Sequence, residues 1–170
     1  MFDIKTILGL WPFLLAYIFL VICFLADLIF IPGWSSVMVR PSLTLIVLFY
    51  WAIYRPTLMP YGVIFLLGLF FDAVSGTYMG LHALIWMAVF WIVKSQRRFL
   101  MGQSFPVIWI AYALISILVS VLGGKWAFAH GSMQDVVSIL ITFLISCFFF
   151  PPVFLGLHFC HRHLPYGGKG

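Results

Sequence analysis

Charged side chains are scarce in this chain of 170 residues. Only 8% of the residues are Asp, Glu, Lys or Arg, four of them are acidic, and 65% are hydrophobic, with a mean hydropathy of +1.18. A water-soluble fold of this size cannot bury so much apolar surface. The composition therefore excludes an ordinary soluble protein and predicts an integral membrane protein.

Long polar segments are also missing from the sequence. The linkers between the apolar blocks are short, so no soluble domain fits between them. The nine Lys and Arg residues stand singly or in short groups at the ends of these blocks. This distribution is typical of membrane topology signals and does not indicate nucleic-acid binding.

Cysteine is rare, with three residues and no C-x-x-C pair, so no disulfide framework is predicted. A C-terminal group has metal-binding residue types, but their order is atypical and no second ligand pair stands elsewhere in the chain. We therefore expect no metal site and no cofactor, and we interpret the group as a partly cationic helix end. Its members are His158, Cys160, His161 and His163.

Catalytic motifs are absent as well. The sequence contains no G-x-S-x-G, no H-E-x-x-H and no Walker lysine loop. No two carboxylates are placed so that they could share the roles of general acid and base. The sequence thus favours a binding or scaffolding role over an enzymatic one.

Six long apolar blocks fill the chain, and each predicts a membrane-spanning helix because backbone groups in a bilayer must be bonded within the segment. The predicted fold is one all-α integral membrane domain, residues 1–170, built as a six-transmembrane-helix bundle. The predicted spans are approximately residues 7–31, 42–54, 57–74, 77–93, 104–122 and 136–160.

The second and sixth of these spans are unusual. Residues 42–54 would cover about 20 Å of a hydrocarbon core about 30 Å thick. This helix must therefore be shielded, be tilted little, or extend upstream. In the sixth span, Pro151 and Pro152 are expected to produce a kink.

The distribution of cations predicts the topology. With six spans and both termini in the cytoplasm, most of the Lys and Arg residues lie inside, as the positive-inside rule requires. Fusing the second and third spans would reverse this balance and bury Arg55. The cations predicted inside are Lys5, Arg55, Lys94, Arg97, Arg98, Arg162 and Lys169, and those predicted outside are Arg40 and Lys125.

Asp72 is the acidic residue that lies well inside an apolar block. A charge in that position costs several kcal/mol unless it is paired or faces a polar interior, so it indicates a functional or assembly site. The predicted topology brings Asp27, Arg40 and His82 to the same outer half of the bundle. We predict that Asp72 pairs with Arg40, directly or through His82.

Three glycines follow the spacing of Asp72. Gly68, Gly76 and Gly80 are separated from it by multiples of four residues, which predicts a small-residue packing seam where the chain is helical. Two interpretations of the region stay open. It is either a structural polar contact inside a packed bundle, or a proton or solute pathway through Asp72.

A basic segment follows the fourth span, where Lys94, Arg97 and Arg98 precede Phe99. The plain interpretation is that these cations hold the topology and attract anionic membrane lipid. The functional interpretation, contact with a protein partner on the cytoplasmic side, is one that the family resemblance described next implies.

Several of these motifs occur together in a fixed order. They are Arg40-Pro41, Tyr50-Trp51 with Arg55-Pro56, Pro60-Tyr-Gly62, Gly68, Asp72, Ser75-Gly76 and Gly80-Leu-His82. In this order they resemble the MreD family, the small multi-span subunit of the bacterial rod-shape and cell-elongation machinery. The resemblance covers about residues 40–105 by motif and the rest by size and hydropathy. Ser42 departs from it, since related chains often carry Asp or Asn after the proline.

The resemblance implies a non-enzymatic, multi-pass subunit of the bacterial inner membrane that takes part in peptidoglycan synthesis. The implied partners are MreC first, then the MreB filament and the synthase pair of RodA and a class B penicillin-binding protein, with membrane lipid around them. A similarity in fold to the substrate-binding subunits of energy-coupling-factor vitamin transporters is also implied. It leaves an alternative function, solute binding or transport, in which Trp34 and Trp126 would line a cavity with the outer polar groups.

Overall fold

The computed structural model describes residues 17–28, 42–124 and 133–162. These residues form helices and turns and contain no strand, which confirms the all-α fold class. The helices are Tyr17–Leu28, α2 (Leu43–Tyr54), α3 (Tyr61–Ser75), α4 (Leu81–Ser95), α5 (Arg97–Leu100), α6 (Phe105–Gly124) and α7 (Met133–Arg162), with a 3₁₀ turn η1 (Pro56–Leu58) after α2.

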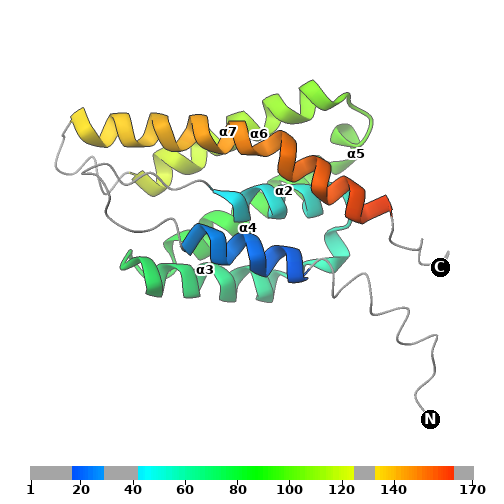
Figure 1. The fold of residues 1–170 in the computed structure, drawn as a ribbon. Coiled ribbons are helices and arrows are strands. Elements are labelled where there is room, and N and C mark those ends of the chain that lie inside the picture. Colours follow the sequence, from blue (N-terminus) through cyan, green and yellow to red (C-terminus); the bar gives the residue numbers. More distant parts are fainter. Residues whose placement is uncertain (1–16, 29–41, 125–132, 163–170) are drawn as a thin grey trace, which may run out of the picture.

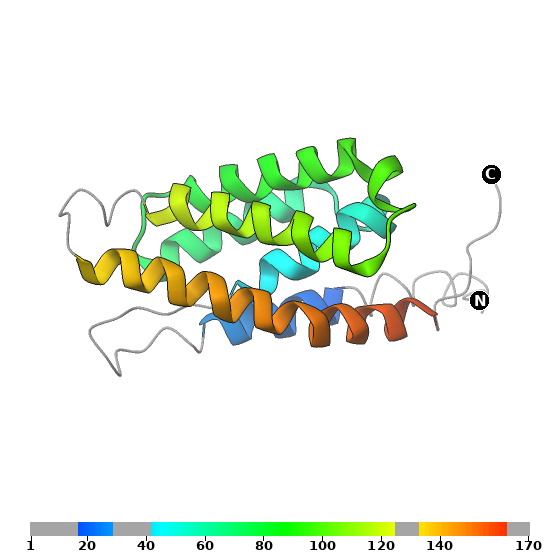
Figure 2. The same ribbon diagram turned by 90° about the horizontal axis from the view of Figure 1, so that it is seen from above.

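Helix α2 is the centre of the structure. It packs against α4 on one side and α7 on the other, and it lies between the α6–α7 pair and the α3–α4 pair in Figures 1 and 2. Every side chain from Leu43 to Ile53 is buried. A helix that is apolar on all sides can be stable only when it is surrounded, so the neighbouring helices shield this short segment.

The α2 core is rich in aromatic rings contributed by α6 and α7. Tyr112 stacks on Phe150 with ring centroids 4.5 Å apart, and Phe49 meets both rings edge-on. Tyr50 packs edge-on against Phe154 at 5.3 Å. These rings bury a large apolar area and hold α6 and α7 against α2.

Two helices among the described residues are long and apolar enough to cross a membrane by themselves. They are α6, over Phe105–Leu122, and α7, over Ile139–Phe159. The helices Tyr17–Leu28, α2, α3 and α4 are apolar but shorter. Helix α7 continues without interruption through Pro151 and Pro152.

The helices α3 and α4 begin later than the predicted spans 57–74 and 77–93. Helix α3 begins at Tyr61 because Pro60 removes a backbone donor and disfavours the helical conformation of Met59 before it. Helix α4 begins at Leu81 because Gly76 and Gly80 adopt the left-handed conformation, with φ of 66° and 96°. Both differences come from local backbone chemistry at the helix ends.

Candidate functional site

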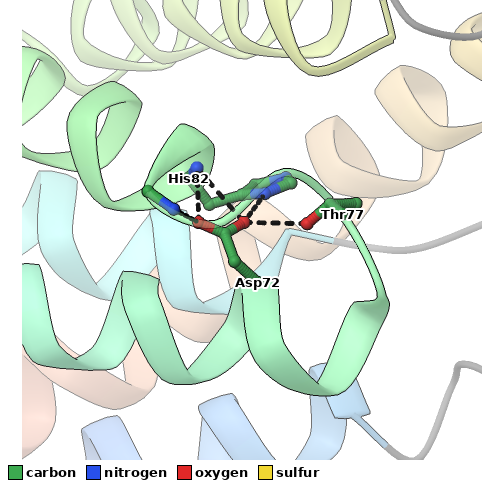
Figure 3. A network of polar contacts seen from close by, with 4 residues as sticks. Asp72, Thr77 and His82 are labelled. Atoms are coloured by element: carbon green, nitrogen blue, oxygen red, sulfur yellow. Dashed lines mark hydrogen bonds and ion pairs between the residues drawn. The ribbon is translucent and has the colours of Figure 1, made fainter.

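Asp72 is the centre of a polar network in the turn that joins α3 to α4 (Figure 3). Its carboxylate accepts hydrogen bonds from Thr77 Oγ1 at 2.9 Å and from the backbone N–H of Gly80 at 2.9 Å. The backbone N–H of His82 lies 3.1 Å from Oδ2 and 3.3 Å from Oδ1. His82 Nδ1 lies 2.6 Å from Oδ1. Asp72 is fully buried, and these donors give both of its oxygens the hydrogen bonds that a buried carboxylate needs.

The geometry of the turn explains why these donors converge. Gly76 ends α3 in the left-handed conformation, and its N–H and that of Thr77 both return to the Asp72 carbonyl oxygen. Gly80 has a positive φ directly before α4. Glycine adopts these angles without steric cost, so the chain can reverse within a few residues and direct its donors at the carboxylate. The first N–H groups of α4 thus gain an anionic acceptor.

The sequence had predicted one packing seam along the three glycines, but they do not lie on one helix face. Gly76 and Gly80 are outside both helices, so the packing seam is limited to Gly68. A Cβ at Gly68 would lie 2.3 Å from the Ala83 Cα, which means that the backbones of α3 and α4 touch there. This close approach places the first turn of α4 beside the Asp72 side chain.

His82 links the network to the apolar interior. Its ring lies 4.8 Å from the Phe71 ring and 6.2 Å from the Trp86 ring, centroid to centroid, and 17% of its side chain is exposed. When the Asp72 carboxylate is ionised it can only accept, and the proton of this contact is then on Nδ1. The predicted Arg40 partner of Asp72 lies outside the described residues.

A second buried carboxylate, Asp27, caps the N-terminus of α2. Its Oδ1 accepts the N–H of Leu43 at 2.9 Å, and its Oδ2 accepts the N–H of Thr44 at 2.8 Å. The N–H of Ser42 donates to Ser146 Oγ at 3.1 Å, although the Ser42 side chain makes no cap bond. First-turn N–H groups lack partners within a helix, and buried ones need an acceptor from elsewhere.

Arg97 caps the other end of α2. Its Nε donates to the Ile53 carbonyl oxygen at 2.6 Å, and its Nη2 donates to the Tyr54 carbonyl oxygen at 3.3 Å. These are last-turn carbonyl groups, where a cation is stabilised by the helix dipole as well as by the hydrogen bonds. Arg97 therefore has a structural role that the sequence did not reveal, whereas Arg98 is exposed.

The other candidate residues are distributed as follows. Tyr50 and Trp51 belong to the buried face of α2, with ring centroids 5.4 Å apart, and Arg55 is half-buried at its C-cap. Lys94 Nζ lies 5.0 Å from the centre of the Tyr61 ring. Four cations, Arg55, Lys94, Arg97 and Arg98, lie near the C-terminal end of α2 or at the α4–α5 junction, and Arg162 ends α7.

The structure offers no metal-ligand cluster within its described portion, where no group of three His, Cys, Asp or Glu side chains comes together. The side chains of Cys160, His161 and His163, from the predicted C-terminal group, fall outside that portion, as do Trp34 and Trp126. Cys23 is a free, buried thiol, and Cys147 is a free, half-buried one.

Comparison with known proteins identifies the family. The family model described as rod shape-determining protein MreD matches residues 9–160. A protein of Haemophilus influenzae described as rod shape-determining protein MreD is 30% identical over 85 residues, which are 50% of this chain and 51% of that protein. The chain thus matches about half the length of this curated relative, and no solved structure matches it. The chain belongs to the MreD family.

Proposed function

We propose that the chain is a non-enzymatic scaffold of the bacterial inner membrane that holds MreC and, with it, MreB and the RodA–penicillin-binding-protein pair during lateral wall synthesis. Membership of the MreD family makes the chain a rod shape-determining membrane protein. The observation that supports a scaffold is that three charged side chains in the bundle bind backbone groups of the same chain. Asp27, Asp72 and Arg97 are all bonded to the bundle's own backbone.

This use of charge fits a structural role better than a reactive one. A catalytic or transport carboxylate needs an accessible proton or ligand and is often left partly unsatisfied. Asp72 has four donor groups around it, all from residues 77–82, and no exposed surface. Its carboxylate is therefore already used to fix the α3–α4 turn.

The packing around α2 favours the scaffold over the solute-binding alternative. A substrate subunit needs a cavity lined by polar and aromatic groups, whereas Leu45, Phe49 and Ala52 of the central helix are completely buried against apolar neighbours. Co-purified small molecules analysed by mass spectrometry test this point. A stoichiometric vitamin-like ligand would favour the transport alternative over the scaffold.

The proposed architecture has six spans with both termini in the cytoplasm, and the fold similarity to energy-coupling-factor substrate subunits belongs to the same proposal. The exposed large apolar side chains on α3, α4, α6 and α7 fit contact with lipid. A topology reporter fused after Gly170 should be active in the cytoplasm, and one inserted at Gly124 should report the periplasm. Cytoplasmic activity at both positions would exclude the six-span arrangement.

The partner proposal is tested by affinity purification of the tagged chain from crosslinked bacterial membranes. We expect MreC as the most enriched protein, with MreB, RodA and a class B penicillin-binding protein at lower enrichment. A tagged membrane protein of similar size and span number, expressed at the same level, controls for non-specific capture. Equal recovery of MreC with both baits would contradict the scaffold role.

A further inference from the structure

The two sides of the bundle differ in the lengths of their helices. Helices α3 and α4 have 15 residues each, whereas α6 has 20 and α7 has 30. At the α-helical rise, α3 and α4 each extend about 22 Å and α6 about 30 Å. The α6 length equals the thickness of an ordinary hydrocarbon core, and the α3 and α4 lengths fall about 8 Å short of it.

Polar groups mark both ends of the short side. At one end, the Lys94 ammonium lies over the Tyr61 ring. At the other end, the turn holds Thr77 and the exposed Tyr78. Lysine and tyrosine side chains favour the membrane–water interface, so they fix the depth at which the apolar surface between them must end.

The surface between these markers carries large apolar side chains. On α3, Phe65 and Leu66 are 39% and 63% exposed, and on α4 Leu84 is 66% exposed. Phe70 of α3 packs against Phe24 of the Tyr17–Leu28 helix, with ring centroids 5.9 Å apart. Helices that pair inside a membrane usually meet through small residues. Gly68 of α3 is already used in this way against Ala83 of the same chain.

We propose that phospholipid acyl chains cover the α3–α4 face and that the bilayer is locally thinner there than along α6 and α7. A helix shorter than the hydrocarbon core is accommodated by bilayer thinning, by snorkelling or by association with other helices. Snorkelling is limited because Lys94 already contacts Tyr61. This proposal rests on the proposed six-span topology. It adds to that topology a preference of the α3–α4 face for short acyl chains.

The test compares two exposed positions on opposite sides of the full-length protein. Leu66→Cys on α3 and Leu114→Cys on α6 are matched, since the native side chains are 63% and 65% exposed. Both are made in a background without native cysteines, labelled with a fluorophore and reconstituted with a nitroxide-bearing phospholipid that quenches it. Phosphatidylcholines with myristoleoyl or erucoyl chains then compete with the quencher.

At Leu66 we expect the short-chain competitor to relieve quenching about threefold more effectively than the long-chain one, with less than about 1.5-fold difference at Leu114. Leu84→Cys on α4 and Leu144→Cys on α7, where the native side chains are 66% and 62% exposed, serve as a second matched pair if a first variant fails to fold. The same chain-length response on both sides, or a long-chain preference at Leu66, overturns the proposal. A label at Leu66 that no lipid quenches places a second copy on this face and also overturns it. The topology reporters can give their expected result whatever the quenching experiment shows. Failure of the lipid proposal can therefore be distinguished from failure of the six-span topology.

Discussion

Two aspartates are buried among the described residues, and their hydrogen-bond donors come from different parts of the chain. Asp72 binds donors that lie within ten residues along the chain, in the turn that follows its own helix and at the start of α4. Asp27 binds the N–H groups of Leu43 and Thr44, which are 16 and 17 residues away on another helix. Asp72 therefore fixes a local turn, whereas Asp27 fixes the position of one helix against another.

The donors at the two sites differ as well. Two partners of Asp72, the Thr77 hydroxyl and the His82 ring, can either donate or accept a hydrogen bond. Each oxygen of Asp27 accepts from a backbone N–H group, which can only donate, and the Thr44 hydroxyl lies beside the same carboxylate. The two sites should accordingly respond differently to the same substitution.

The largest expected effect is at Asp72. Asp72→Ala leaves two backbone N–H groups and the Thr77 and His82 side chains without their acceptor, and should cost about 3–5 kcal/mol. Asp72→Asn should recover much of this, because its oxygen can face the N–H groups and its amide can donate to Thr77 and His82. Accumulation in membranes and the Tm of the purified protein measure both variants. Wild-type behaviour of Asp72→Ala would remove the basis for treating the site as important.

The same pair of substitutions at Asp27 should give a different result. Asp27→Ala should cost about 2–4 kcal/mol, since it leaves two buried N–H groups of α2 without an acceptor. Asp27→Asn should be almost as harmful as Asp27→Ala, because the Asn NH₂ group would face one of these two N–H groups, donor against donor. The Tm difference between Asn and Ala variants, compared at both positions, is the measurement. An Asn rescue at position 27 as complete as that at position 72 would disprove the distinction.

Arg97 and Arg98 provide a smaller, paired test at the opposite end of α2. Arg97→Gln should lower stability by about 1–3 kcal/mol because it weakens two charge-assisted bonds to the α2 carbonyls. Arg98→Gln should change stability by less than about 0.5 kcal/mol, since the side chain is exposed. Thermal unfolding of both variants in detergent is the readout, and equal losses would contradict the capping role.

Arg98→Gln also separates the two interpretations of the basic segment, because it leaves the Arg97 cap intact. If this stable variant inserts normally but cells lose their rod shape, the segment has a partner role. If the cell shape is unchanged, the Arg98 cation is needed at most for insertion and lipid contact.

The smallest expected effect concerns Ser146. Ser146→Ala removes the acceptor of the Ser42 N–H and should cost about 1 kcal/mol. Ser146→Cys, of similar volume, controls for packing, and the shift in Tm measures both variants. A loss as large as that of Asp27→Ala would mean that Ser146 dominates this helix end.

The sequence predicted the features that local chemistry determines. The all-α class follows from composition, and the contact of Asp72 with His82 follows from a topology that places both residues in the same half of the bundle. The predicted pairing with Arg40 lies outside the described residues. The caps on α2 were not predicted because their partners are distant in the chain: Arg97 and Ile53 are 44 residues apart, and Ser146 and Ser42 are 104 apart. A pattern of apolar blocks specifies that helices exist, but it does not specify which polar side chain meets which helix end.

The caps of α2 have a consequence for the order of biosynthesis. Asp27 leaves the ribosome before α2, so the acceptor for its first N–H groups is already made when the helix forms. Arg97 and the α7 side chains that cover α2 are synthesised only later. Until then the last carbonyl groups of α2 need water, because no partner exists for them in hydrocarbon. We therefore expect the central helix to stay near the bilayer surface until Arg97 has been made and to reach its final position only when α7 packs against it.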